Sequence, residues 1–172
     1  MAQFARPDTD ISKGGWTAST GTDLWEMINE TPASDTDYAR SGDNPTTAET
    51  YEAALSSVTD PVSSTGHVVR YRYQKNESGG GKATGIDLTV YLVENTTVIA
   101  SQAHTDISVG YLDGSFTLTA GEADSITDYT DLRLRFTAQD DASGARTSWA
   151  EVSFSELEVP NVASDRRIFI IS

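Results

Sequence analysis

The strongest constraint on the fold is a period of two in the apolar residues between residues 86 and 160. These residues recur at Ile86, Leu88, Val90, Leu92, Phe116, Leu118, Leu132, Leu134, Phe136, Val152 and Phe154. Alternate side chains of a strand lie on one face of a sheet, so each segment is expected to bury one face and expose the other. Half-buried strands at short spacing predict an all-β fold, an antiparallel, jelly-roll-like β-sandwich of about eight strands.

The segments between the strands predict how they pair. A Gly-rich stretch joins the strands at 66–76 and 86–94, and a short loop joins those at 131–139 and 147–159. Each pair is therefore expected to form a hairpin, because sequential strands often pair. A further tight turn is predicted at Asn95-Thr96.

Three local features interrupt the strand pattern. In the last strand the apolar parity shifts between Phe154 and Leu157, which predicts a β-bulge near Ser155. A short helical segment is expected at 22–30, where Thr22 or Asp23 can provide the cap and Asp23 with Glu26 has capping-box spacing. A second is expected at 120–125, where Thr119 and Glu122 have the same spacing.

The length of 172 residues suits one domain with peripheral segments. We divide the chain into an N-terminal arm with a first strand (1–20), a β-sandwich domain (21–160) and a C-terminal arm (161–172). No secretory leader and no membrane-spanning segment is expected, because the N-terminal residues lack an apolar run and no stretch has the length of a membrane helix. The sequence has no cysteine, which excludes disulfides and thiolate metal sites.

The formal net charge of −14 comes from 26 acidic and 12 basic residues. Phosphate binding needs clustered Lys and Arg, so this composition disfavours nucleic acid and anionic membranes as partners. Net charge informs about binding partners and solubility, but it does not predict the fold.

Sequence motifs point away from catalysis. There is no nucleophile-elbow motif, and the segment 78–82 lacks the first Gly and the final Ser or Thr of a phosphate-binding loop. A glycosidase needs two placed carboxylates, and the pair Glu49 and Glu52 and the triple Glu151, Glu156 and Glu158 show no such pattern. A non-enzymatic protein without a cofactor is therefore predicted.

Two binding chemistries stay open. Calcium takes carboxylates from loops, as at Asp124, Asp128 and Asp131 or at Asp140 and Asp141, although the spacing of a calcium-binding loop is absent. The two histidines, His67 and His104, are expected to be surface or satisfied residues and not metal ligands. Among the aromatic residues, Trp149 is the best candidate for stacking on a sugar ring, although burial in a core or an interface is its expected role.

The end of the sequence differs in character from the rest. After Pro160 come two basic and four apolar residues, Arg166, Arg167, Ile168, Phe169, Ile170 and Ile171. Leaving such apolar side chains in water forfeits about 1.5–3 kcal/mol each. The segment is expected either to form a last strand of this domain's own sheet or to add to a sheet of a neighbouring subunit.

Several phrases resemble tailed-phage virion structural proteins. They are RPDTDISKGGWTASTGTDLWEMINE, TGHVVRYRYQKN, IDLTVYLVE, ADSITDYTDLRLRFTA and VSFSELEVP, and together they span about residues 6–160. The resemblance implies a head decoration (cement) protein that braces capsid subunits through its terminal arms. It implies interface candidates at Phe4, Arg6 and Trp16 and at residues 166–171.

The resulting prediction is a non-enzymatic bacteriophage structural protein on the capsid surface of the virion, made in the host cytoplasm. The implied partners are the major capsid protein and neighbouring copies of the chain, as a homo-oligomer such as a trimer. Contacts would come from sheet edges and terminal arms. The alternatives are a carbohydrate-binding module on a phage spike or fibre, and a tail or connector component.

Overall fold

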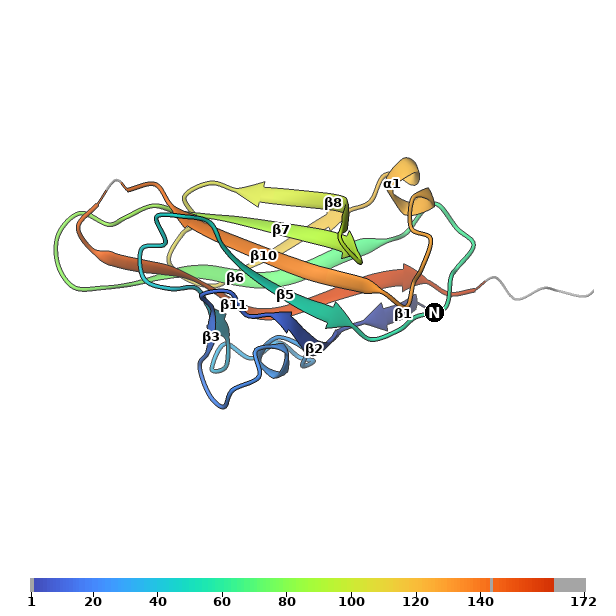
Figure 1. The fold of residues 1–172 in the computed structure, drawn as a ribbon, viewed down its shortest axis with the longest axis horizontal. Coiled ribbons are helices and arrows are strands. Elements are labelled where there is room, and N and C mark those ends of the chain that lie inside the picture. Colours follow the sequence, from blue (N-terminus) through green and yellow to red (C-terminus); the bar gives the residue numbers. More distant parts are fainter. Residues whose placement is uncertain (1, 143, 163–172) are drawn as a thin grey trace, which may run out of the picture.

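The computed structural model describes residues 2–142 and 144–162, which form two antiparallel β-sheets packed face to face (Figure 1). The six-stranded sheet contains β1 (Ala2–Ala5), β3 (Thr17–Ala18), β4 (Ala39–Arg40), β6 (Val68–Ser78), β9 (Leu112–Thr117) and β11 (Thr147–Pro160). The five-stranded sheet contains β2 (Pro7–Ser12), β5 (Glu49–Leu55), β7 (Ile86–Glu94), β8 (Thr97–His104) and β10 (Leu132–Asp140). The predicted all-β sandwich is confirmed, with eleven strands in the described residues in place of about eight.

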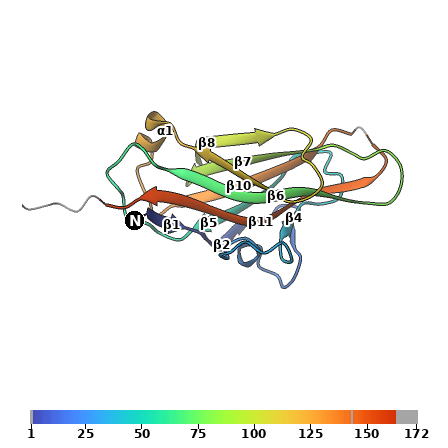
Figure 2. The ribbon, with the colours of Figure 1, turned by 180° about the vertical axis from the view of Figure 1, so that it is seen from behind.

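The strand order explains the jelly-roll-like character of the fold. The order is β3-β4-β11-β6-β9 in one sheet and β2-β5-β10-β7-β8 in the other, and β1 pairs with β11. From β5 to β7 and from β8 to β11, each connection passes from one sheet to the other. Strands β6 and β11 form the centre of the six-stranded sheet, which faces the viewer in Figure 2.

Two predicted hairpins are wrong, and one is confirmed. Strand β6 pairs with β11 and β9, whereas β7 pairs with β10 and β8, so residues 79–85 cross between the sheets. The same holds for β10 and β11. Alternation identifies the buried face of a strand but not its partner, and seven residues suffice to cross the ~10 Å between packed sheets. The turn at Asn95-Thr96 does join β7 to β8 as predicted.

The predicted β-bulge exists, slightly earlier than expected. The register of β11 against β6 shifts between Val152 and Phe154, which places the extra residue at Ser153. Val152 therefore faces the core, whereas Phe154 pairs with Arg72 on the outward face, contrary to the expected inward position of Phe154. The bulge thus adds an aromatic ring to the solvent side of the sheet.

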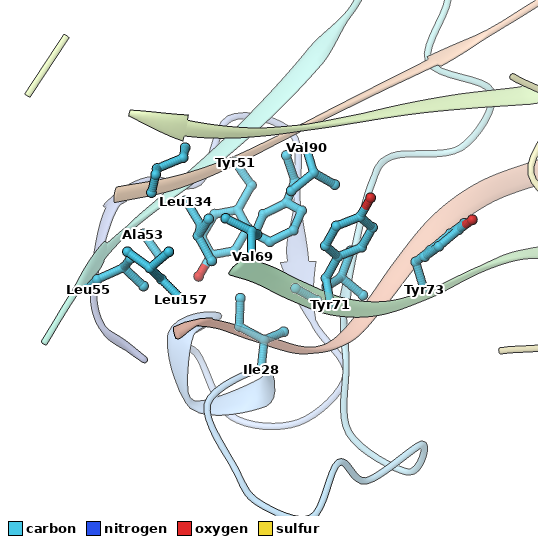
Figure 3. Close-up of a cluster of buried hydrophobic side chains, with 14 of the residues drawn as sticks. Ile28, Tyr51, Ala53, Leu55, Val69, Tyr71, Tyr73, Val90, Leu134 and Leu157 are labelled. Carbon is cyan, nitrogen blue, oxygen red and sulfur yellow. The ribbon is translucent and has the colours of Figure 1, made fainter. Parts of the chain in front are cut away.

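The core lies between the sheets and contains most of the predicted alternating residues (Figure 3). Phe116 is only partly buried against it, and Phe154 lies outside it. An aromatic group stands at the centre of the core. The Tyr51 and Phe136 rings stack with centroids 6.0 Å apart, and Trp16 packs against both at 6.0 and 6.4 Å. The Trp16 indole donates a hydrogen bond to the backbone oxygen of Glu49 at 3.2 Å. Apolar burial of this kind is the main source of the stability of the sandwich.

The N-terminal residues, expected to be an arm with a first strand, contain strands that pair with both sheets. Strand β1 pairs with β11, and β2 pairs with β5, so the segment contributes to both sheets. The reason is that the long strands β5 and β11 have edges that need hydrogen-bond partners. The short strands β3 and β4 extend the six-stranded sheet beyond β11.

The helix expected at 22–30 is reduced to the single 3-10 turn η1 (Trp25–Met27). Its cap is not the expected Thr22 or Asp23 but the carboxylate of Asp10 in β2. Asp10 accepts hydrogen bonds from the backbone N–H groups of Leu24 and Trp25 and from the Tyr51 hydroxyl, each at 2.9 Å. A tertiary contact therefore replaces the local cap.

The second predicted helix is confirmed as α1 (Ala120–Asp124). Thr119 caps it, and the reciprocal hydrogen bonds between Thr119 and Glu122 complete a capping box. Within the described part of the chain, no helix has the length and apolar character to cross a membrane.

The two histidines predict how stability depends on pH. Burial lowers the pKa of His67, against the raising effect of the nearby Asp60 and Asp124 carboxylates, and burial also lowers the pKa of His104. The His67 ring bonds the Tyr129 hydroxyl at 2.8 Å, and the His104 ring lies between the hydroxyls of two tyrosines. Both rings therefore bind a proton less readily in the folded chain than in the unfolded chain, where the pKa is about 6.5.

Stability is expected to be complete above pH ~6.5 and to fall as the pH drops from there towards the lowered pKa values. The unfolded state then binds up to two more protons, which gives a slope of at most about 2.7 kcal/mol per pH unit. Urea unfolding of the wild type and of His104→Gln between pH ~7.5 and ~5 measures this. The variant should show a shallower slope, and equal slopes would contradict the assignment.

Candidate functional site

The outward face of the six-stranded sheet carries polar and aromatic side chains on its two central strands. On β6 the outward residues are Val68, Arg70, Arg72, Gln74 and Asn76, and on β11 they are Trp149, Glu151, Phe154, Glu156 and Glu158. The register places Trp149 opposite Asn76, and Glu151 opposite Gln74. Alternation along each strand therefore brings an aromatic ring, two amides and a carboxylate together.

Glu151 is the centre of this group, which we call the Glu151 cluster (Gln74, Asn76, Tyr111, Trp149 and Glu151). Its side chain is fully buried although it lies on the outward face. One carboxylate oxygen accepts the Trp149 indole N–H at 2.6 Å and the Asn76 amide at 3.0 Å. The other accepts the Gln74 amide at 2.6 Å and the Tyr111 hydroxyl at 3.1 Å. Four donors thus satisfy one buried carboxylate.

Each of the two aromatic rings of the Glu151 cluster has an arginine guanidinium near it and a hydrogen bond to Glu151. The Arg40 guanidinium lies 4.0 Å from the centroid of the Trp149 ring, and the Arg72 guanidinium lies 5.4 Å from that of Tyr111. Burial and the neighbouring Glu151 carboxylate raise the pKa of Tyr111, so its hydroxyl keeps its proton and donates. Trp149 is partly exposed and is not part of the core, which was one of its two expected positions, whereas burial in an interface stays a prediction.

Arg72 connects the loop that contains Asp35 to the middle of the same face. Its guanidinium donates to both carboxylate oxygens of Asp35 at 2.7 Å and to Asp113 at 3.0 Å. The Arg72 guanidinium lowers the pKa of Asp35. Asp35 also accepts from the Ser153 hydroxyl at 3.2 Å, so the bulge takes part in the contact.

Beyond this bridge lies a pocket of about 330 Å³, which we call the Phe154 pocket. Phe154, Arg70, Asp113 and Ser115 line it, together with Gly114 and the Tyr71 ring. A Cβ on Gly114 would lie 2.4 Å from the Tyr71 ring, so a larger residue there would displace the ring. The outward face thus offers two aromatic positions, Trp149 opposite Asn76 and Phe154 opposite Arg72.

The outward face of the five-stranded sheet has a different composition. There Glu52 accepts hydrogen bonds from Arg133 at 3.1 Å and from Arg135 at 2.6 Å, and Tyr91 lies opposite Arg135 on the neighbouring strand. The pockets of about 310 and 330 Å³ are lined by residues outside this face. Tyr91 therefore provides a matched aromatic control for Trp149.

Of the interface candidates from the sequence, the described residues include Phe4, Arg6 and Trp16, and the first two lie against each other. Phe4 is 44% exposed on β1, with the Arg6 guanidinium 5.5 Å from its ring centroid, and Arg6 pairs with Glu156 at 2.9 Å. Trp16 is only 3% exposed and belongs to the core. The remaining candidates, Arg166, Arg167, Ile168, Phe169, Ile170 and Ile171, lie outside the described residues.

The acidic loops considered for calcium have other partners. Asp128 accepts from the Thr130 backbone and hydroxyl at 2.8 and 2.6 Å, and Asp131 pairs with Arg133 at 2.9 Å. Among residues 2–142 and 144–162, no group of three or more His, Cys, Asp and Glu side chains could hold a metal ion.

Sequence reasoning identified one member of the site and missed the others. Trp149 was the candidate for sugar stacking, and Gln74 and Asn76 could have been placed beside it from the period of two along β6. Tyr111 comes from a loop before β9, and its contact with Glu151 spans 40 residues. No local pattern marks such a contact.

No family model and no curated protein matches the chain. The solved structures with a similar fold include one described as "CBM4 structure and function", with a TM-score of 0.46 and 13% identity over 84% of this chain and 94% of that chain. A CBM22-1 xylan-binding domain from Paenibacillus barcinonensis Xyn10C has a TM-score of 0.39 and 11% identity, and covers 94% of this chain and 95% of its own. TmCBM61 in complex with β-1,4-galactotriose has a TM-score of 0.39 and 6% identity, with coverages of 91% and 86%. At these scores the similarity carries no argument about a ligand of this chain.

Proposed function

We propose that this β-sandwich is a non-catalytic carbohydrate-binding protein whose site is the outward face of β6 and β11. The observation that carries the proposal is the Glu151 cluster. A buried carboxylate fixes a partly exposed Trp149 ring beside two amides and a tyrosine hydroxyl. The proposal does not include a reaction.

This combination of groups suits a sugar. A pyranose ring has apolar C–H faces that pack on an aromatic ring, and hydroxyls at its edge that need hydrogen-bond partners. Side chains already held in place on rigid strands lose little conformational entropy on binding. The Glu151 cluster supplies both kinds of contact from adjacent strands.

The charges favour an uncharged ligand. The arginines of this face are paired with carboxylates, as Arg6 is with Glu156, Arg70 with Glu158 and Arg72 with Asp35. The whole chain has a net charge of −14, which repels anionic polymers. A neutral polysaccharide is therefore the proposed class.

The spacing of the aromatic positions favours an extended ligand. Trp149 and Phe154 lie on the same face of β11 with the bulge between them. At a rise of about 3.3 Å per residue they are roughly 13 Å apart, which is longer than a single sugar ring. A chain of several sugars could contact the Glu151 cluster and the Phe154 pocket together.

The Trp149→Ala variant tests the proposal. Loss of the stacking surface is expected to weaken binding at least about tenfold, or about 1.4 kcal/mol. Affinity electrophoresis in gels containing soluble β-1,4-xylan, β-1,4-galactan or β-1,4-glucan derivatives measures the effect. The matched control is Tyr91→Ala on the opposite face, which should migrate like the wild type. Retardation of all three proteins to the same extent would place the site elsewhere.

The virion decoration role stays a prediction. It depends on terminal contacts, and most of the residues named for them lie outside the described part of the chain. Quantifying copies of the chain against the major capsid protein in purified particles would test it separately.

A further inference from the structure

A second pocket is lined by residues of the loop after β5 and by residues of α1 and the segment that follows it. Helix α1 and the end of β11 lie at the same end of the sandwich (Figure 1). The volume of the pocket is about 310 Å³. The apolar part of its lining comes from Val62, Ala123, Ile126 and Tyr129, and the charged part from Asp60 and Asp124. The proposed carbohydrate site does not use this pocket.

Val62 is an unusual residue at this pocket. Its side chain is 86% exposed, and its backbone has a φ of +51°. A β-branched residue rarely adopts a positive φ, because Cβ and the side chain collide with the backbone. The Asp60 carboxylate holds this conformation by accepting the Val62 backbone N–H at 2.7 Å. A strained backbone that holds the apolar Val62 side chain in water suggests that another segment or molecule covers this side chain.

The position of the pocket points to the end of the chain. A Cβ on Gly66 would lie 3.0 Å from the Pro160 ring, so the loop that forms the pocket touches the last residues of β11. Ser64, two residues before Gly66, lines the pocket. Residues 163–172 follow directly, and ten extended residues can span at most about 33–36 Å. They therefore have the length to return to the pocket.

The composition of that segment complements the pocket. It places Arg166 and Arg167 before four apolar residues, in a chain with a net charge of −14. We propose that residues 163–172 dock into this pocket of their own chain. The contacts proposed for this docking are ion pairs of Arg166 and Arg167 with Asp60 and Asp124, and apolar contact of residues 168–171 with Val62 and Ile126.

Docking within one chain is favoured over docking between copies. A connection of a few residues gives the segment a millimolar effective concentration at the pocket. Two copies with the same large negative charge repel each other. The proposed ligand of this pocket is therefore the segment 163–172 of the same chain.

Hydrogen exchange tests the proposal in the full chain. Amides in 60–64 and 123–129 are expected to exchange at least about tenfold more slowly than in a chain truncated after Val162. The difference should be the same over a roughly fiftyfold range of protein concentration. Equal exchange in the two proteins would overturn the proposal, and protection that appears only at high concentration would replace it with docking between copies.

Charge exchange provides the matched control. Arg166→Glu with Arg167→Glu should remove the protection, and adding Asp124→Lys, which leaves the hydrogen bond between Asp60 and Val62 intact, should restore part of it. The Phe154 pocket and the Glu151 cluster serve as internal references, because their exchange should not change. Failure of the charge exchange to restore protection would exclude the proposed ion pairs. Binding of polysaccharide does not enter any of these outcomes.

Discussion

Replacement of Glu151 with alanine is expected to lower the melting temperature by roughly 6–20 °C, which corresponds to about 3–5 kcal/mol in a domain of this size. The change removes the carboxylate that accepts four hydrogen bonds. The donors that lose this acceptor are the side chains of Gln74, Asn76, Tyr111 and Trp149. These donors are partly buried, and each bond to a charged carboxylate contributes about 1.5–3 kcal/mol. Differential scanning calorimetry measures the shift.

The matched control for Glu151 is Glu158→Ala on the same face of the same strand. Glu158 is partly exposed and pairs with Arg70, and an ion pair near solvent contributes about 0–1 kcal/mol. A loss for Glu151→Ala as small as that for Glu158→Ala would show that the Glu151 cluster does not hold the aromatic rings in place. The Glu151→Ala protein should also bind polysaccharide less well, since Trp149 and Tyr111 lose their common anchor.

Replacement of Phe136 with alanine is expected to lower the free energy of unfolding by about 3–5 kcal/mol. The Phe136 side chain is fully buried, stacks on Tyr51 and packs against Trp16. The substitution removes a large apolar surface and leaves a cavity that β-strands on both sides cannot close. Urea unfolding with a fixed m-value measures the loss.

Phe136→Leu separates cavity formation from loss of the ring itself. Leucine fills most of the volume, so the expected loss is less than about 1.5–2 kcal/mol. If both variants lost the same amount, packing volume would not be the reason. If neither lost more than about 1 kcal/mol, the aromatic group would not be central to the core.

The faces of the strands could be predicted from the sequence, whereas their partners could not. Ile86 to Leu92 and Leu132 to Phe136 alternate and are buried as expected. The strands before and after the segment 79–85 show the same alternation whether they pair in one sheet or lie in two. Choosing between these cases depends on packing between residues far apart in the chain, which a period of two does not encode.

Two errors show how a single residue changes the outcome. The bulge lies at Ser153 instead of near Ser155, and this difference turns Phe154 from the core to the outward face. The turn η1 is capped by Asp10, which precedes it by 14 residues, so no local capping pattern is present. Helical propensity between 22 and 30 was overridden by this tertiary contact.

The candidate site was predictable only in part for the same reason. Trp149 is a conspicuous aromatic residue in a strand, and its sequence position sufficed to nominate it. The role of Glu151 appears only when β6 and the loop carrying Tyr111 are placed beside β11. A buried carboxylate on an outward face is a feature of three-dimensional structure that composition does not reveal.

The most direct test of the central claim follows the indole N–H signals of the three tryptophans by NMR. Trp149 donates this group to Glu151, whereas the Trp16 indole is buried in the core. On titration with β-1,4-linked xylo-, galacto- or gluco-oligosaccharides, the account predicts that the Trp149 signal shifts and the Trp16 signal does not. A shift of the Trp16 or Trp25 signal without a shift of the Trp149 signal, or no shift with any of these sugars, would contradict a carbohydrate site on the face of β6 and β11.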